Sequence, residues 1–326
     1  MTSHYEKFIF LFIVIGAIFF GRLAYPNISA VPSFINNNPP QIADAETTTA
    51  PPTLVLPETS LNSANVARNF SNSPATNNTT TSLTSLPKFS NEAYMIANLT
   101  TGTIIAGSNI SKRWPTASLT KLMTATLILD QLSTTTTITI TPQMFAADPN
   151  ERTLVIGGTY TVEDLLHIML MPSSNVAAQA MADYIGQTKF MNEMNARAAA
   201  WGMTDTYFDD PSGISAANQS TAKDLMILAQ HVYESYPDIL ALTNTPVTTI
   251  TELNSGRKIL VRSINNFAGT PDFIGGKTGN TPQAGANLLS IFNDGGTPIY
   301  ITVLGAPALP FMDTAALYAW YKTNYN

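Results

Sequence analysis

The order of strand-like and helical patterns along residues 89–326 limits the folds open to this chain of 326 residues. Short alternating or β-branched runs lie near the start of this region and again near its end, whereas helical patterns fill the middle. The sequence lacks the regular strand–helix–strand alternation of a doubly wound fold. It therefore predicts an α+β fold, an antiparallel sheet built from both ends of the region and packed on helices, with an inserted all-helical lobe.

Local signals place the individual elements. Thr161 and Asp164 form a capping box at the start of one helix, and Ser220 is the expected cap of a later one. Turn residues at 254–256 and 294–296 close two β-hairpins. We expect strands within 92–109, a strand ending at Thr141, hairpins at 247–263 and 286–306, and helices at 117–130, 161–170, 175–186, 189–201, 220–236 and 311–325.

The N-terminus carries an unbroken apolar run of thirteen residues, Phe8–Phe20. This length is typical of a signal-peptide core, but Lys7 and Arg22 can snorkel at the two ends and let the segment span a bilayer. We interpret residues 1–26 as an N-terminal membrane anchor or signal peptide, and favour an uncleaved anchor over cleavage after Ala30. In both cases we expect an extracytoplasmic protein, tethered to the cell membrane or released after signal cleavage.

Residues 27–88 are rich in Ser, Thr, Asn and Pro and contain few charges or aromatic rings. Such a segment buries too little apolar surface to offset the entropy cost of ordering it. We therefore predict a disordered linker over 27–88, with a root-mean-square reach of about 40–45 Å as a flexible coil. One globular domain is predicted over 89–326.

Composition excludes several classes of function. The chain has no cysteine, which removes disulfides and thiolate catalysis, and it has three histidines, His4, His167 and His231. A histidine-dependent triad or a zinc site therefore has at most two histidines in the globular region to use, and both lie on predicted helices. We expect no metal. The net charge of −6 argues against nucleic acid as a partner.

Ser118 and Lys121 lie three residues apart in the apolar helical stretch TASLTKLMTATLILD, residues 116–130. At this spacing the two side chains share one helix face, and a neutral lysine can accept the serine proton as the hydroxyl attacks a carbonyl. An unperturbed lysine has a pKa of about 10.4, whereas a useful base needs roughly 7–8, and burial beside a second cation can supply the shift. A helix start with a surface lysine is the alternative, because two other S-x-x-K matches begin at Ser85 and Ser220.

Two further motifs follow in the chain. An S-x-N triplet, Ser173–Asn175, lies in a loop before a helix, and the single K-T-G of the sequence, residues 277–279, lies at the predicted start of a strand. Glycines on both sides of Lys277 permit the close approach of a ligand backbone. A lysine that blocks edge-to-edge strand pairing is the alternative interpretation.

The ordered set S-x-x-K, S-x-N and K-T-G is the signature of penicillin-binding proteins and class A β-lactamases. With the stretches PTASLTKLMTA, MPSSNVAAQAMAD, DPSGIS and GGKTGNTPQAG, the sequence resembles the serine D-alanyl-D-alanine carboxypeptidases, the low-molecular-mass penicillin-binding proteins. The resemblance implies a β-lactamase/transpeptidase-like fold and removal of the terminal D-alanine from peptidoglycan stem peptides that end in D-Ala-D-Ala. It also implies β-lactam antibiotics as covalent inhibitors, and no cofactor.

The resemblance assigns roles to the first two motifs. Ser118 would be the acylated nucleophile and Lys121 its general base. Ser173 would relay a proton to the leaving amine, and Asn175 would hold the substrate amide.

The K-T-G motif would complete the site. Lys277 would keep Lys121 neutral and attract the substrate carboxylate, to which Thr278 would donate a hydrogen bond. Gly279 would leave room for the substrate to lie beside the strand as an additional strand. The backbone N–H groups of Ser118 and Asn280 would form the oxyanion hole.

Three other functions stay open at this point. A D,D-endopeptidase that cuts peptide crosslinks uses the same residues. A class A β-lactamase needs a deacylating glutamate in an E-x-x-L-N context, which Glu193 lacks, so we interpret Glu193 as part of a solvated helix face. The non-enzymatic alternative is an inactive penicillin- or wall-binding module, against which the intact motifs argue.

Overall fold

The computed structural model describes residues 85–308 and 310–325. The predicted anchor, 1–26, lies outside the described residues, as does the predicted linker, 27–88, except for its last four positions. The first regular element among the described residues is strand β1, Ala93–Asn98. No helix in the described part of the chain is both long and apolar enough to cross a membrane.

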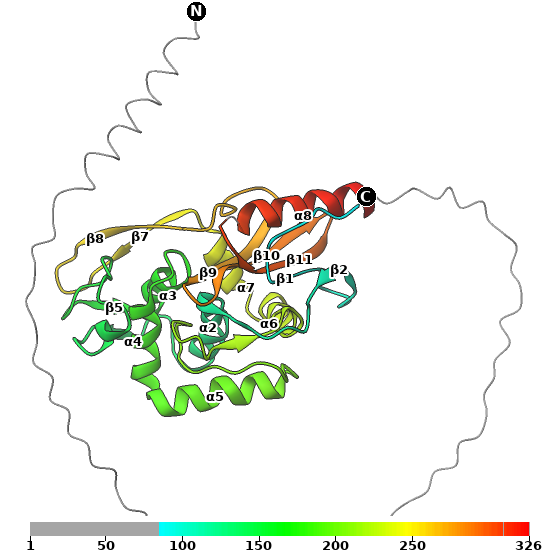
Figure 1. Ribbon diagram of the computed structural model, residues 1–326. Coiled ribbons are helices and arrows are strands. Elements are labelled where there is room, and N and C mark those ends of the chain that lie inside the picture. Colours follow the sequence, from blue (N-terminus) through cyan, green and yellow to red (C-terminus); the bar gives the residue numbers. More distant parts are fainter. Residues whose placement is uncertain (1–84, 309, 326) are drawn as a thin grey trace, which may run out of the picture. The chain divides into compact units, whose positions relative to one another are not determined.

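A five-stranded antiparallel sheet combines the two ends of the domain, as predicted (Figure 1). Its strand order is β2-β1-β11-β10-β9, so the first strand pairs with the last and Ala93 lies opposite Leu304. Strand β9 forms one edge of the sheet. The bounds of the other four strands are β2 Ile104–Ser108, β9 Phe273–Thr281, β10 Gly285–Asp294 and β11 Thr297–Ala306.

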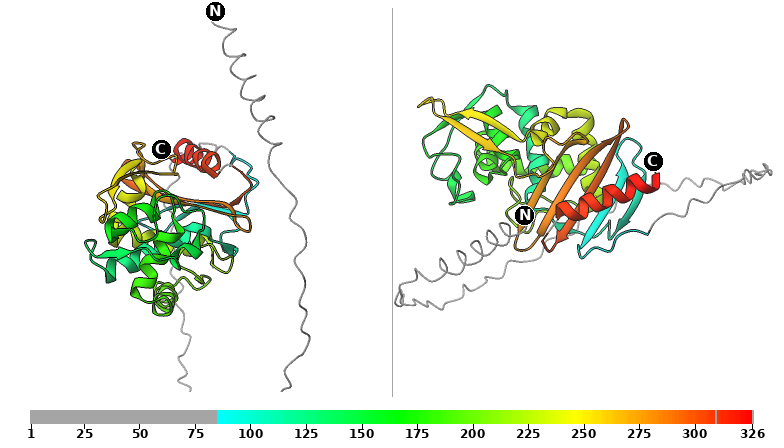
Figure 2. Two further views of the ribbon diagram at one scale, coloured as in Figure 1. Left: turned by 90° about the vertical axis from the view of Figure 1, so that its left-hand side faces the viewer. Right: turned by 90° about the horizontal axis from the view of Figure 1, so that it is seen from above.

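Helices cover both faces of this sheet (Figure 2). Helix α8, Pro310–Tyr325, lies alone on one face, where Phe292, Ile301 and Trp320 belong to one apolar cluster. On the opposite side α6 and α7 contact the sheet, and the other helices pack mainly on one another; together they form the larger core. They are α2 Thr120–Gln131, α3 Val162–Leu170, α4 Asn175–Ile185, α5 Gln187–Ala200, α6 Ala222–Ser235 and α7 Pro237–Asn244, with the 3-10 turns η2 Ala117–Leu119 and η3 Met144–Ala147.

Three short two-stranded sheets join these helices. Strand β3, Trp114–Pro115, pairs with β6, Gln219–Ser220, and β4, Thr137–Thr139, pairs with β5, Thr159–Thr161. The third is the ribbon of β7, Val247–Thr251, and β8, Lys258–Arg262.

Helix α2 is buried on all sides. Nine consecutive residues, from Thr120 to Ile128, are shielded from solvent, and Lys121 is one of them. A helix without a polar face must lie inside the domain. This position explains why the helix contains a lysine that never reaches the surface.

Most predicted elements are found, with local corrections. Thr161 caps α3 by accepting a hydrogen bond from the Asp164 N–H, as predicted. The cap predicted at Ser220 is wrong, because Thr221 accepts from the Asp224 N–H whereas Ser220 is a buried residue of β6. The short helix α7 was not predicted.

Candidate active site

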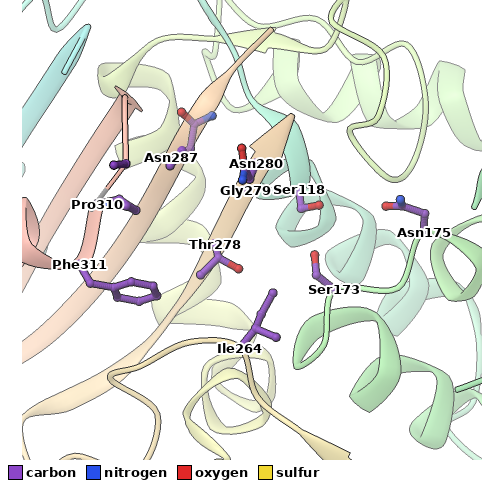
Figure 3. Close-up of a pocket in the computed structure, with 12 residues that line it drawn as sticks. Ser118, Ser173, Asn175, Ile264, Thr278, Gly279, Asn280, Asn287, Pro310 and Phe311 are labelled. Atoms are coloured by element: carbon purple, nitrogen blue, oxygen red, sulfur yellow. The ribbon is translucent and has the colours of Figure 1, made fainter. Parts of the chain in front are cut away.

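A cleft opens between β9, the turn before α2 and the loop before α4 (Figure 3). The two predicted lysines, Lys121 and Lys277, are only 0% and 1% exposed and reach this cleft through hydrogen bonds to Ser118 and Ser173. The structure thus brings the eight predicted site residues together from three separate parts of the chain. Six of them line the cleft: Ser118, Ser173, Asn175, Thr278, Gly279 and Asn280.

Ser118 lies in the 3-10 turn η2, directly before α2. Ala117, the residue before it, has a φ of +48°, a conformation that is uncommon for residues other than glycine and concentrates at functional sites. Two glycines allow the chain to pack closely around this turn. A Cβ on Gly213 would lie 1.8 Å from the Ala117 carbonyl oxygen, and one on Gly279 would lie 3.1 Å from the Ser118 nitrogen. Backbone on two sides therefore fixes the position of Ser118.

The amine of Lys121 has three hydrogen-bond partners. Its Nζ lies 2.8 Å from Ser118 Oγ, 2.7 Å from Asn175 Oδ1 and 2.7 Å from the Ser212 carbonyl oxygen. An ammonium group has three N–H donors, so these acceptors satisfy it completely. Loss of one proton leaves two donors and a lone pair, which can face the Ser118 hydroxyl.

Burial makes this loss accessible near neutral pH. It lowers the pKa of Lys121 from its usual 10.5 to about 7, and the carboxylates of Asp210 and Asp148 oppose part of the shift. Burial and the charge of Lys121 also hold the pKa of Lys277 well below its ordinary value. We expected burial beside a second cation to lower the pKa of Lys121, and the family resemblance implied Lys277 as that cation. In the structure burial lowers the pKa of Lys121, and the repulsion between the two ammonium groups lowers the pKa of Lys277 instead.

Ser173 and Lys277 form a second serine–lysine pair. Lys277 Nζ donates to Ser173 Oγ at 2.8 Å and to the Thr278 carbonyl oxygen at 3.0 Å. Ser173 has a φ of +70°, again a left-handed conformation in a residue other than glycine. The cleft therefore holds two hydroxyl groups, each supported by its own buried amine.

Asn175 is the first residue of α4 and lines the cleft. Its Oδ1 is engaged with Lys121, so its Nδ2 group is the donor left for a substrate carbonyl. The start of α4 is fixed by Ser174, whose Oγ accepts from the Ala177 N–H and donates to Glu151. No sequence motif pointed to Glu151, which lies in the loop after η3.

The K-T-G motif lies in the middle of β9, not at the start of a strand as predicted. Helix α7 covers the first half of the free edge of β9, where Thr243 Oγ1 accepts from the Gly276 N–H at 3.0 Å. The second half, with Thr278 and Asn280, borders the cleft. An extended peptide can add to such a strand edge.

The glycines around Lys277 serve the packing of the protein itself, and the approach of a ligand backbone to them stays a prediction. A Cβ on Gly275 would lie 2.7 Å from Thr243 Oγ1, and one on Gly276 would lie 2.1 Å from the Leu289 carbonyl oxygen. Gly279 faces the turn that carries Ser118.

The loop of residues 210–218 is a part of the site to which sequence reasoning gave no role. The Asp210 carboxylate accepts hydrogen bonds from the Ser212 N–H at 2.7 Å, the Gly213 N–H at 2.7 Å, the Ser215 N–H at 2.8 Å and Asn218 Nδ2 at 2.6 Å. Burial acts to raise the pKa of Asp210, but hydrogen bonds from the Ser212 hydroxyl and from the Ser215, Ser212 and Gly213 N–H groups outweigh it and lower the pKa. They also aim the Ser212 carbonyl at Lys121. The Asp-Pro-Ser-Gly sequence, typical of a turn, was the available signal.

The other residues weighed in the sequence lie elsewhere. Glu193 sits on the surface of α5, where it pairs with Lys189 at 3.8 Å and accepts from Gln131. His231 stacks on Trp201 with ring centroids 4.1 Å apart, and the His167 ring bonds to a backbone carbonyl of its own helix.

A family model described as D-alanyl-D-alanine carboxypeptidase matches residues 79–308. The chain belongs to the D-alanyl-D-alanine carboxypeptidase family. The family resemblance seen in the sequence, and the enzyme class that follows from it, are confirmed.

Curated relatives and solved structures agree with this family. The D-alanyl-D-alanine carboxypeptidase DacB2 of Mycobacterium tuberculosis is 29% identical over 240 residues, which cover 70% of this chain and 81% of the relative. A D-alanyl-D-alanine endopeptidase of Pseudomonas aeruginosa is 31% identical, with 70% of this chain and 76% of the relative covered. The crystal structure of the Streptomyces K15 DD-transpeptidase superposes with a TM-score of 0.68 at 26% identity, covering 74% of this chain and 100% of that one. The predicted fold is therefore confirmed as well.

Proposed function

We propose that this member of the family is a serine D,D-carboxypeptidase, which removes the terminal D-alanine from peptidoglycan stem peptides through an acyl-enzyme on Ser118. The observation that carries the proposal is the distance of 2.8 Å between Ser118 Oγ and the fully buried Nζ of Lys121. A buried amine with a pKa of about 7 is a suitable base for a serine hydroxyl.

In the acylation step, Ser118 Oγ attacks the carbonyl carbon of the penultimate D-alanine and its proton passes to neutral Lys121. The backbone N–H groups of Ser118 and Asn280, both at the cleft, are the proposed donors to the oxyanion. The carbon–nitrogen bond then breaks. Ser173 protonates the leaving amine and regains a proton from Lys277, its partner at 2.8 Å.

Deacylation reverses these proton movements. Water attacks the acyl carbon and gives a proton through Ser173 to Lys277, which is now neutral. Lys121 returns its proton to Ser118 Oγ as the ester bond breaks. Each serine–lysine pair thus ends the cycle in its starting state.

A cation beside the scissile bond favours a substrate with a free C-terminal carboxylate. Such a carboxylate near Lys277 and Thr278 favours the charged form of Lys277. That charge in turn disfavours a proton on Lys121, because the two amines repel each other when both are protonated. Binding of the substrate carboxylate therefore favours the neutral form of Lys121, which is the form that acts as the base. This coupling supports the assignment as an exopeptidase.

Penicillin labelling and D-alanine release together test the proposal. We expect mass spectrometry after penicillin treatment to find a stable adduct on Ser118, and a peptide ending in D-Ala-D-Ala to release one D-alanine. Ser118→Ala should abolish both. Ser85→Ala, which alters another S-x-x-K serine, is the matched control and should change neither. An adduct elsewhere, or no adduct, contradicts the proposal, and rapid turnover of penicillin would indicate a β-lactamase.

An endopeptidase activity is the second candidate, because a relative with 31% identity carries that name. It would use the same proton transfers on a D-alanyl bond whose amine belongs to a crosslinked stem peptide. Crosslinked and uncrosslinked muropeptides, compared as substrates at equal concentration, separate the two. Faster cleavage of the crosslinked species would favour the endopeptidase.

We further propose that residues 1–26 tether the protein to the outer face of the cell membrane. The apolar run Phe8–Phe20, with Lys7 and Arg22 at its ends, supports this location. Membrane fractionation of the full chain, compared with a chain that lacks 1–26 and carries a cleavable export signal, tests it. A full chain that is recovered in the soluble fraction would contradict the tether.

A further inference from the structure

Strand β8 presents a row of exposed side chains that leads into the active-site cleft. Lys258, Leu260, Arg262 and Ile264 are exposed at alternate positions, and we call these four residues the β8 ladder. Between them, Val261 is buried against the body of the domain, as expected for the period of two of a strand. Leu260 and Ile264 are 55% and 50% exposed, so two apolar side chains lie in the same row as the two cations.

The ladder is continuous with the cleft. Ile264 lines the cleft and faces Ser173 and Thr278 in Figure 3. Its backbone N–H donates to the Met171 carbonyl at 3.1 Å, which fixes the end of the ladder beside the loop that carries Ser173. The far end of the β7–β8 ribbon is fixed as well, because the Leu253 N–H donates to the Thr159 carbonyl at 2.9 Å. The row is therefore a rigid extension of the site.

The β8 ladder carries two positive charges, although the protein as a whole has a net negative charge. The chain has a net charge of −6, and four of its surface cations are held in ion pairs with carboxylates. Lys258 and Arg262 form no ion pair with any residue in the described ranges. Between Asp238 and Asp272 the only acidic residue is Glu252, which is buried and accepts hydrogen bonds from the turn around Ser255. Lys258 Nζ donates to Thr251 Oγ1 at 2.7 Å, a neutral partner, so among the described residues no carboxylate is paired with either cation.

Distance separates the ladder from the bond that is cleaved. Strand residues rise about 3.3 Å each, so Lys258 and Arg262 lie about 13 Å apart along β8, with Lys258 at the end farther from Ile264. A D-alanyl-D-alanine end is only about 7 Å long when extended. Lys258 therefore lies too far from the cleft to contact a D-alanyl-D-alanine end bound there, and only a larger substrate can reach it.

We propose that the β8 ladder is a docking surface for polymeric peptidoglycan, whose stem peptides bear free carboxylates. Lys258 and Arg262 pair with those carboxylates, and Leu260 and Ile264 pack against the aliphatic parts of the same chains. This inference rests on the proposed function and extends it, since it selects polymer over free peptide. Pairing at an exposed surface is weak for each contact and is screened by salt. The ladder therefore acts through several contacts with one long polymer.

Co-sedimentation with insoluble peptidoglycan tests the ladder without turnover. The full-length Ser118→Ala protein, kept in mild non-ionic detergent, is compared with the same protein carrying Lys258→Glu and Arg262→Glu. The matched control carries Lys189→Glu and Lys223→Glu, exposed lysines of α5 and α6 with the same total change in charge. We expect the ladder variant to bind about tenfold more weakly, or ~1.4 kcal/mol. The control should bind within about twofold of the parent.

Two treatments of the polymer identify the ligand. Amidation of the peptide carboxylates should reduce binding of the parent protein to the level of the ladder variant, whereas removal of phosphate-containing wall polymers should leave binding unchanged. Equal binding by ladder variant and parent overturns the proposal, as does binding that follows the phosphate instead of the carboxylate.

The proposed function is checked separately. D-alanine release from a small neutral peptide, measured with Ser118 intact, should be the same with and without the ladder changes. Absence of release by the otherwise unchanged protein would refute the carboxypeptidase assignment without affecting the binding result. An equal loss of small-peptide turnover in the ladder variant would show that the changes damage the cleft, and would overturn docking as their effect.

Discussion

Replacement of Gly213 by alanine should disable acylation of Ser118 through the backbone alone. A Cβ at this position would lie 1.8 Å from the Ala117 carbonyl oxygen and 2.8 Å from Thr120 Oγ1. Contacts of a Cβ shorter than 3.0 Å are essentially never seen, so the turn or the loop must move by at least about 1.2 Å. A displacement of about 1 Å in a positioned reacting group can reduce its rate roughly 10²-fold. We therefore expect the acylation rate of Gly213→Ala to fall by about 10²-fold or more.

Gly202→Ala is the control for this experiment. Gly202 has a φ of +80°, close to the +85° of Gly213, but no atom lies within 4 Å of a Cβ placed there. Both variants carry the cost of a left-handed residue, about 1–2 kcal/mol, and only Gly213→Ala adds the steric clash. Acylation is followed with a fluorescent penicillin, and circular dichroism with a thermal melt reports on the fold. If Gly213→Ala reacts as fast as Gly202→Ala, the packing of this loop does not position Ser118.

Three further predictions concern titratable groups. Lys121→Ala should keep the fold and slow acylation about 10²–10⁴-fold, the usual contribution of a general base, and an unchanged labelling rate would remove Lys121 from that role. In the native protein, the acylation rate should rise with pH through about 7 as Lys121 loses its proton. Asp210→Asn should move this rise to lower pH, because the Asp210 carboxylate raises the pKa of Lys121. A flat pH–rate profile between 5.5 and 8.5 would contradict both expectations. A hydrogen bond from the Ser255 hydroxyl, and weaker contributions from backbone N–H groups, lower the pKa of Glu252 from 4.5 to about 2. The ionised carboxylate therefore stabilises the fold above the unfolded pKa, and this stabilisation is lost as the pH falls toward 2. Glu252→Gln should therefore lower the melting temperature at pH 7 but not near pH 2, and a difference that persists at low pH would exclude the ionised carboxylate as its cause.

Local sequence patterns predicted most of the strands and helices of the domain. Alternating apolar runs and glycine-containing turns gave the strands at both ends of the domain, and the capping pair Thr161 and Asp164 gave the start of α3. The three motifs gave the site residues because each motif keeps its members within a few positions of one another. The structure added that the motifs meet in one cleft.

What the sequence did not predict depends on backbone atoms and on distant packing. The Ser212 carbonyl bonds to Lys121 from 91 positions away, and a carbonyl has no residue type by which to recognise it. Glu151 supports Ser174 across 23 positions without any motif. The choice between Ser220 and Thr221 as a helix cap depends on which residue pairs with β3, a contact that no local pattern records.

Because β1 pairs with β11, the central sheet cannot form until both ends of the domain are available. Ala93 cannot pair until Leu304 is available, and until then β1 has an unpaired edge in the middle of what becomes the sheet. Such distant pairing slows folding and prolongs the exposure of aggregation-prone segments. Ser118 precedes α2, whereas Lys277 and Gly279 belong to β9, so we expect no reaction with penicillin until the strands at both ends of the domain have paired.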